Sequence, residues 1–314
     1  MYNIAKAQRV EMDNTLEQYR LDMIESVSEK YELDGEIQSK IPNLDFYFSP
    51  RLIEKTSIMY QPSLCVILQG EKEVHFGNNI YTYNTNDYLL SSADLPAQIK
   101  LLEASAEKPY LSLRVKFTLE EIYEVIKTLD KDRYSVDKNA DKGLFFNQMS
   151  LDLYSAVHKL MMLLDKPQED IDFLYPLYTK EILFHLVKGE SGFFLNKFSI
   201  DGTVSNKIVK VVSDIKKNLD EKLNIKDLAN SVDMSESSFY HHFKTITSLS
   251  PIQFQKKLRL EESKNLLYLK DLEINEVAFQ VGYESPSQFS REFSRMFGMS
   301  PKAYSLHHMH KQAC

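Results

Sequence analysis

The C-terminal third of this chain contains one sequence pattern twice. The segment IKDLANSVDMSESSFYHHFKTITSLSP begins at Ile225, and INEVAFQVGYESPSQFSREFSRMFGMSP begins at Ile274. Their apolar and small residues match at an offset of 49 positions and, after one extra residue in the second turn, at an offset of 50. Such a repeat predicts one supersecondary unit used twice, so this region must fold as two similar elements.

Each copy is predicted to form a helix, a tight turn and a second helix. Gly282 supplies a turn position that can take positive φ, and Asp233, which tolerates that conformation better than most residues, stands there in the first copy. Ser235 and Ser285 are suited to cap the second helix of each pair, and Pro286 is suited to its first turn. The pattern is that of two helix-turn-helix units.

The segment between the two copies predicts a rigid spacer. PIQFQKKLRLEESKNLLYLK begins at Pro251 and predicts a helix of about 18 residues, roughly 27 Å long at 1.5 Å per residue. Successive major grooves of DNA lie about 34 Å apart, so the spacer could hold two recognition helices near one DNA turn from each other.

The second helix of each copy has an aromatic face and a polar face. Phe239 and Phe243 share one side of the first helix, and Phe289 and Phe293 share one side of the second. The polar faces and their flanks give the candidate DNA-binding residues: Ser237, Ser238, Tyr240, His241, Lys244, Ser287, Gln288, Arg291 and Arg295. Arg and Gln suit base edges, and Ser suits bases or phosphates. A merely solvated polar face is the alternative, which the duplication and the spacer disfavour.

The charge is distributed unevenly along the chain. The net charge of −7 argues against a DNA-binding protein until the chain is divided. From Ser205 onward there are 16 Lys and Arg against 13 Asp and Glu, whereas the preceding residues hold 22 against 32. This asymmetry places the DNA-binding function at the C-terminal end.

The N-terminal half has a different pattern of apolar and turn residues. Between Ile41 and Phe117, short apolar runs such as SLCVILQG, DYLLSS and YLSLRVKF are separated by turn residues, which predicts successive strands. Gly77-Asn78-Asn79 predicts a hairpin. Closely spaced strands favour an antiparallel sandwich or small barrel. Helical periodicity marks residues 3–31, 119–130 and 150–188, and the polar stretch 196–206 is the expected linker.

These motifs resemble the AraC/XylS family of transcription regulators. The resemblance covers about residues 207–305, through the pair Leu228-Ala229 and the segments SSFYHHFK, SPIQFQKKLRLEESKNLL and VGYESPSQFSREFSRMFG followed by SPKAY. In the N-terminal half it rests on PSLCVILQGEKEVHFGNNIYTYNTNDYLLSSADLP and EKPYLSLRV. It implies an α+β multidomain protein: a cupin-like antiparallel β-barrel with flanking helices, then an all-α domain with two helix-turn-helix units.

The resemblance also implies domain limits and partners. Residues 1–195 are expected to form the sensing and dimerisation domain, 196–206 the linker and 207–308 the DNA-binding domain. The implied partners are double-stranded DNA, RNA polymerase and a small-molecule effector. The family pattern has Arg or Lys where His241 stands and a basic residue where Ser294 stands, so both departures weaken the charge expected at the DNA. Because His241 stands where the second copy has Arg291, the first unit is expected to contribute less affinity than the second.

Two other functional classes are compatible with a barrel joined to a DNA-binding region. One is a barrel enzyme, but His75 is the only histidine in residues 1–150, and no nucleophile-elbow, P-loop or dinucleotide motif is present. We therefore expect no catalytic residue, no metal and no cofactor. The other is a structural DNA binder whose barrel serves only for dimerisation.

The chain has two cysteines, Cys65 and Cys314, too few for a disulfide framework or a zinc site. Cys65 lies in the apolar run LCVIL and is expected to be a buried small hydrophobe. The alternative is a thiol inside a ligand pocket, which makes Cys65 the one candidate ligand-binding residue.

The remaining expectations concern surroundings and assembly. No apolar run approaches the roughly 20 residues of a membrane span, and no secretory pattern begins the chain, so a cytoplasmic, reducing compartment is expected. Within 150–188, VHKLMMLL and KEILFHLV have wide apolar faces that suggest a homodimer interface. Packing of those faces on the chain's own barrel is the alternative.

Overall fold

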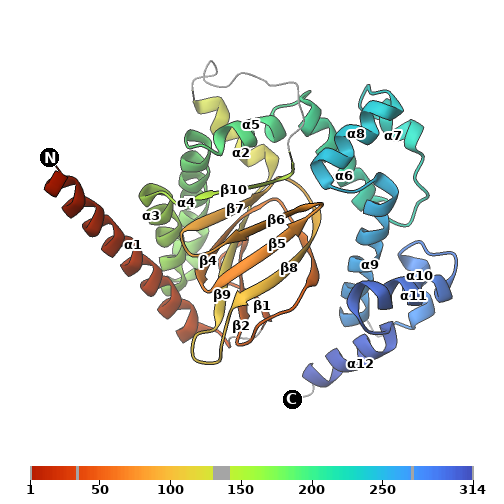
Figure 1. Ribbon diagram of the computed structural model, residues 1–314, viewed down its shortest axis with the longest axis horizontal. Coiled ribbons are helices and arrows are strands. Elements are labelled where there is room, and N and C mark those ends of the chain that lie inside the picture. Colours follow the sequence, from red (N-terminus) through yellow and green to blue (C-terminus); the bar gives the residue numbers. More distant parts are fainter. Residues whose placement is uncertain (1, 33–34, 130–141, 270–271, 313–314) are drawn as a thin grey trace.

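The computed structural model describes residues 2–32, 35–129, 142–269 and 272–312. Two antiparallel sheets with helices along one side form the N-terminal part, and helices alone form the C-terminal part (Figure 1). This is the α+β arrangement that the sequence predicts. Cys314 lies outside the described residues.

The larger sheet has six strands, which lie in the order β1 (Gly35–Gln38), β2 (Leu44–Ser49), β9 (Tyr110–Lys116), β4 (Ser63–Gln69), β7 (Asp87–Ser91) and β10 (Leu144–Gln148). The smaller sheet has the order β3 (Thr56–Tyr60), β8 (Leu95–Glu103), β5 (Glu71–Phe76) and β6 (Asn79–Tyr83). All pairings are antiparallel, and Gly77, at φ 61°, turns the predicted hairpin between β5 and β6. Across the described strands the two sheets share no ladder, so the cupin-like barrel is an open sandwich.

Some strands were not predicted. The sequence runs identified β4 to β9, but β10 lies beyond the predicted strand region, after α2. It pairs with β7, and only two of its five residues, LFFNQ, are polar. A short run that follows a helix carries too little alternation to identify a strand, since its partner lies more than fifty positions earlier in the sequence.

Helices cover the outer face of the six-stranded sheet. They are α1 (Tyr2–Lys30), α2 (Leu119–Thr128), α3 (Leu151–Met161), the short 3₁₀ helix η2 (Met162–Asp165), α4 (Gln168–Lys188) and α5 (Gly192–Ser199). The three predicted helical regions are thus helical. Strand β4 is buried on both faces because α1 packs against it, and Leu64, Val66 and Leu68 are fully buried.

The apolar residues on which the dimer interface was predicted pack inside the chain. Val157, Leu160 and Met161 of α3 are buried, as are Ile182 and Leu186 of α4. The alternative of packing on the chain's own barrel therefore accounts for them. A different part of α4 remains uncovered: Phe173 is 72% exposed and Leu177 is 53% exposed.

The C-terminal part consists of helices α6 (Val204–Lys217), α7 (Ile225–Ser231), α8 (Glu236–Thr247), α9 (Pro251–Leu269), α10 (Ile274–Gln280), α11 (Pro286–Phe297) and α12 (Pro301–Gln312). Ser250 and Ser300 cap the N-termini of α9 and α12, since each hydroxyl accepts a hydrogen bond from a backbone N–H three residues later. Aromatic side chains from α8, α9, α11 and α12 fill the spaces between these helices.

The segment 196–206, predicted as a linker, is largely helical. It contains the end of α5, a turn and the start of α6. Several of its polar residues are buried, and two of them bond to the backbone: Asn206 Nδ2 donates to the Phe198 carbonyl at 2.9 Å, and the Thr203 hydroxyl caps α6. Polar composition suggested a loop, but here the polar groups satisfy the backbone at a helix–helix corner.

The barrel and the first helix-turn-helix unit are in direct contact. The Gly143 amide, just before β10, donates to the Ile246 carbonyl of α8 at 3.0 Å, and the Gly143 carbonyl accepts from the Ser92 amide at 3.0 Å. Lys216 of α6 pairs with Asp94 at 2.6 Å. We call these contacts the seam. They connect the sheet to the recognition helix α8 through backbone groups and to α6 through an ion pair.

Candidate nucleic-acid interface

The first helix-turn-helix unit consists of α7 and α8. Asp233 takes φ 56° in the turn, the left-handed conformation predicted for it. Ser235 caps α8, since its hydroxyl accepts from the Ser238 amide at 3.3 Å. The small side chain of Ala229 is buried where the helices meet. The local geometry predicted for this unit is confirmed.

The second unit, α10 and α11, repeats this construction. Gly282 takes φ 84° in the turn, and the Ser285 hydroxyl accepts from the Gln288 amide at 3.3 Å. Pro286 occupies the first turn of α11, where a missing N–H costs nothing. Gly298 ends α11 in a left-handed conformation, as Ser248 ends α8.

The two turn residues differ because their surroundings differ. A Cβ on Gly282 would lie 2.6 Å from the Cα and the carbonyl oxygen of Asp220, and 2.7 Å from the Arg259 guanidinium. The second turn therefore has no room for the side chain that the first turn accepts at Asp233. The positive φ favours glycine, and the close approach requires it.

The two recognition helices bury their aromatic faces completely. Phe239, Phe243, Phe289 and Phe293 have no exposed surface. The opposite faces carry the candidate DNA-binding residues. Seven of these are exposed, namely Ser237, His241, Lys244, Ser287, Gln288, Arg291 and Arg295. Ser238 and Tyr240 are half-buried, and the Tyr240 ring lies 6.4 Å from that of Phe239.

One carboxylate on α11 organises several of its neighbours. Glu292 accepts hydrogen bonds from Lys256 of α9 at 2.9 Å, from the Tyr283 hydroxyl at 2.9 Å and from Gln288 at 3.2 Å. Burial raises the pKa of Glu292, but the bonds from Lys256, Tyr283 and Gln288 outweigh it, so the pKa lies below its usual value. Sequence analysis missed this cluster, because the polar side of α11 was judged only for contact with DNA.

Arg259 ties the spacer to the second unit and to the loop between α6 and α7, which leads into the first unit. Its guanidinium donates to the Gly282 carbonyl at 2.6 Å in the second unit's turn and to the Leu219 carbonyl at 2.8 Å after α6. It also donates to the carbonyls of Asp220 and Glu221. Gln255, one turn earlier in α9, donates to the Glu221 carbonyl at 2.7 Å. A single side chain thus connects the turn of the second unit with the loop that leads into the first.

Helix α9 sets the separation of the units. Its 19 residues give a length of roughly 28 Å at 1.5 Å per residue. Figure 1 shows α8 near one end of α9 and α11 near the other. In this conformation α11 also lies against β3 and α9 against β8, so the second unit touches the barrel.

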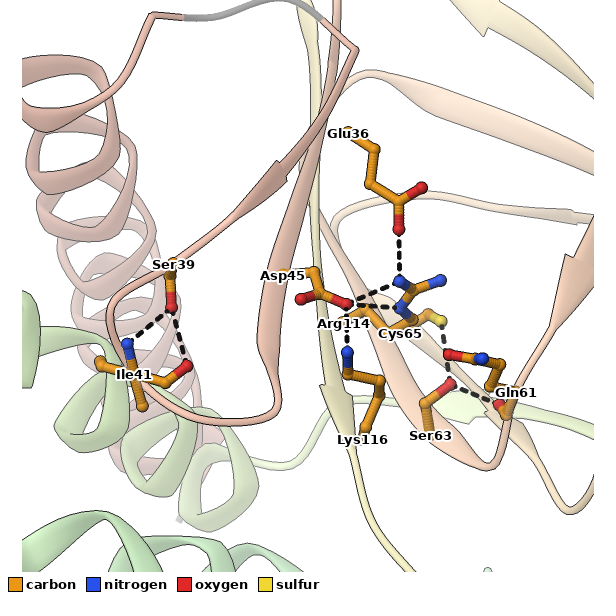
Figure 2. Close-up of polar contacts among 9 residues, drawn as sticks. All are labelled: Glu36, Ser39, Ile41, Asp45, Gln61, Ser63, Cys65, Arg114 and Lys116. Carbon is orange, nitrogen blue, oxygen red and sulfur yellow. Dashed lines mark hydrogen bonds and ion pairs between the residues drawn. The ribbon is translucent and has the colours of Figure 1, made fainter. Parts of the chain in front are cut away.

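The candidate ligand-binding residue Cys65 lies inside the barrel. It is buried, and its Sγ is 3.8 Å from the Ser63 hydroxyl (Figure 2). Burial raises the pKa of the thiol, and the nearby cations Lys72 and Arg114 only oppose that effect. The sequence showed no basic neighbour, because both cations come from other strands. A buried, protonated thiol is a poor nucleophile.

A charged cluster lies beside Cys65 on the inner face of the larger sheet. Asp45 of β2 pairs with Arg114 at 2.6 Å and with Lys116 at 2.9 Å, and Arg114 also pairs with Glu36 (Figure 2). His75, the other N-terminal residue considered for ligation, is paired with Glu73. Among the residues described, no three His, Cys, Asp or Glu side chains gather as a metal site, and no helix could cross a membrane.

Comparison with known proteins identifies both halves. The family described as "AraC-type transcriptional regulator N-terminus" matches residues 40–193, and "Helix-turn-helix domain" matches residues 228–306. The chain belongs to the AraC family of transcription regulators. The match at 228–306 covers both duplicated units, so DNA binding through helix-turn-helix units is the family property it carries.

Relatives in the AraC family match over different lengths. The lactose operon transcription activator of Staphylococcus xylosus is 21% identical over 86% of this chain and 90% of its own length. The virulence regulon transcriptional activator VirF of Shigella flexneri is 21% identical over 75% of this chain and 87% of its own. The probable regulator LumQ of Photobacterium leiognathi is 31% identical, but the match spans only 40% of that protein.

The fold of the whole AraC-family chain has a solved counterpart. ToxT from Vibrio cholerae superimposes with a TM-score of 0.57 at 14% identity, covering 84% of this chain and 98% of ToxT. At this identity the likeness shows the fold alone. It extends through the barrel and the helical part together.

The close approach at Gly282 generates a stability prediction. Gly282→Ala adds left-handed strain and a backbone clash, so we expect a lower thermal unfolding midpoint and a loss of about 1–3 kcal/mol. Gly298→Ala is the matched control, because Gly298 has a similar φ of 74° with nothing within 4 Å of its Cβ position. It should cost only the backbone strain. Equal losses for both variants, measured by calorimetry, would refute a packing role for Gly282.

Proposed function

We propose that this chain is a sequence-specific transcription regulator controlled by a small molecule in its N-terminal barrel. The observation that carries the proposal is the Arg259 lock, which holds two helix-turn-helix units at the ends of a helix roughly 28 Å long. A rigid pair near one DNA turn apart suits recognition of two successive major grooves. The polar faces of α8 and α11 would then meet DNA.

The two units are expected to contribute unequally. On α11, Arg291 and Arg295 offer planar, permanently charged forks that suit guanine or phosphate. On α8, Lys244 is a point charge, and His241 occupies the position equivalent to Arg291. An imidazole offers fewer donors than a guanidinium and no planar fork. The serines and Gln288 would add contacts to bases or phosphates.

Control by an effector is supported by the seam. A change in the barrel near β10 would reach α8 through the Gly143–Ile246 hydrogen bond, and a change at β3 would reach α11. One structure of ToxT, whose fold this chain shares, contains an unsaturated fatty acid. A small molecule that favours one arrangement of the seam would shift DNA affinity by its preference for that arrangement.

The activating role, the partners and the domain limits extend this proposal. Two of the long relatives carry the name of activator, which favours activation through RNA polymerase for this chain. A cytoplasmic location follows from that role. Residues 1–195 would sense and dimerise, 196–206 would connect, and 207–308 would bind DNA. Turnover of a substrate by the purified chain would instead favour an enzyme, and DNA binding unaffected by any metabolite would favour a purely structural DNA binder.

The test of DNA recognition uses sites recovered by genomic footprinting of the full chain. We expect Arg291→Ala to weaken binding to its specific site by about 1–3 kcal/mol, and His241→Ala by less. Affinity should fall steeply with salt, because phosphate contacts release counterions.

The control for that test is Arg51→Ala, which removes an exposed arginine from the barrel. It should leave affinity unchanged in the same titration. A larger loss from His241→Ala than from Arg291→Ala would reverse the proposed order of the two helices. A loss of the same size from Arg51→Ala would show that overall charge, and not the α11 face, determines affinity.

The uncovered apolar pair on α4 makes a homodimer testable. Phe173 and Leu177 lie one helical turn apart and are exposed, as an anchor in a subunit interface would be in an isolated chain. We expect the parent to sediment as a dimer at micromolar concentration and the double variant Phe173→Lys, Leu177→Lys as a monomer. Leu52→Lys, at a barrel residue that is 56% exposed, should remain dimeric. A monomeric parent would rule this interface out.

A further inference from the structure

A lysine is buried between the two sheets of the barrel. Burial alternates along β5, so Lys72, Val74 and Phe76 face the interior while their neighbours are partly exposed. Only 6% of Lys72 is exposed, and its Nζ lies 5.4 Å from the ring centre of Tyr110 and 5.5 Å from that of Tyr83. Aromatic faces attract an ammonium group, but they supply no counter-charge.

No carboxylate of the described chain pairs with Lys72. The interior carboxylate of the larger sheet, Asp45, is already held by Arg114 and Lys116. An ammonium group that is removed from water without a partner is costly, and natural proteins usually pair such a charge. The Lys72 ammonium is therefore a hydrogen-bond donor and a positive charge for which the described residues supply no anion.

Three tyrosines lie around Lys72. Tyr60 of β3, Tyr83 of β6 and Tyr110 of β9 are each no more than 4% exposed, and no described group forms a well-oriented hydrogen bond with any of their hydroxyls. The Tyr83 hydroxyl lies near that of Tyr60 and partly opposes the rise that burial causes in the pKa of Tyr60. Each unpaired buried hydroxyl costs about 1–3 kcal/mol. Both sheets contribute to this cluster, which we call the Lys72 cluster.

Tyr60 and Tyr83 act as uncharged donors at neutral pH. Burial raises the pKa of Tyr60 and of Tyr83, and the nearby Lys72 only partly opposes it. Neutral phenols keep their O–H groups, so they cannot neutralise the lysine. They can donate hydrogen bonds to an acceptor placed among them.

We infer that the Lys72 cluster binds the carboxylate of a small organic acid. This inference rests on the proposed effector control and specifies the chemistry of the effector. A carboxylate accepts hydrogen bonds only, carries the missing negative charge and has lone pairs for the lysine and the phenols together. The inward-facing Val74, Phe76 and Ile99 are buried and apolar, so the remainder of the acid would be apolar. A neutral polyol would satisfy the hydroxyls but leave the ammonium without a counter-charge.

The probes are benzoate and hexanoate, each compared with its amide, which has nearly the same shape and no charge. We expect the acids to raise the thermal unfolding midpoint of the full chain and to bind measurably by calorimetry at millimolar concentration. The amides should do neither. Inorganic phosphate tests whether any oxyanion suffices; a response equal to that of the acids would overturn the assignment to a carboxylate.

The first variant is Lys72→Met, which keeps the length of the side chain and removes its charge. We expect binding of the acids to weaken more than tenfold while the ligand-free variant is as stable as the parent or more so, because an uncompensated buried charge has been removed. The control is Lys100→Met on β8, whose exposed side chain is only 3.7 Å from Glu54 in a surface ion pair. It should bind the acids as the parent does.

The second variant, Tyr83→Phe, removes one hydroxyl. We expect the affinity for benzoate to fall roughly five- to tenfold, the usual effect of one hydrogen bond, with the thermal midpoint without ligand preserved or raised, because an unpaired buried hydroxyl has been removed. This variant separates recognition from packing, since the ring remains in place.

Three results would overturn the inference: no response of the parent to either acid, an equal response of the parent and Lys72→Met, or destabilisation of ligand-free Lys72→Met. The effector role fails separately. If the acids bind in a Lys72-dependent way but leave operator affinity unchanged, the binding site is supported, and control of DNA binding by this class of ligand is refuted.

Discussion

The arrangement of the DNA-binding helices depends on one guanidinium group. Arg259 donates to carbonyls in the loop between α6 and α7 and in the turn of the second unit. Those carbonyls lie at helix ends and turns, where backbone groups lack helical partners. Because Gly282 has no side chain, Arg259 can approach its carbonyl closely, and the two helix-turn-helix units become one rigid body about the length of α9.

That rigid body does not stand apart from the barrel. The Gly143 amide reaches α8, its carbonyl is held by Ser92, and Lys216 pairs with Asp94 on the same side of the sheet. These contacts are backbone hydrogen bonds and one short ion pair, so they are sensitive to small displacements of β10 and of the strand ends around it. Such a seam suits a protein whose two parts must respond to each other.

The barrel interior contains polar groups that do not stabilise the fold, because they lack partners within the described chain. Asp45, Arg114 and Lys116 satisfy one another, whereas Lys72 and the nearby tyrosine hydroxyls do not. Unsatisfied buried groups persist in proteins where a function retains them. The same interior explains why Cys65 is unsuited to be a reactive thiol: burial keeps it protonated.

The sequence by itself determined the duplicated helix-turn-helix units, their serine caps, the turn glycine, the aromatic faces and most strands, because these depend on periodicity and on conformational preferences of neighbouring residues. Tertiary structure decided the carbonyls that Arg259 binds, the role of Glu292, the packing of α3 and α4 and the helical course of residues 196–206. It also decided that Lys72 meets three tyrosines from other strands. Alternation places Lys72 on one face with Val74 and Phe76, but which face lies inside depends on how distant strands pair, and local sequence does not encode that.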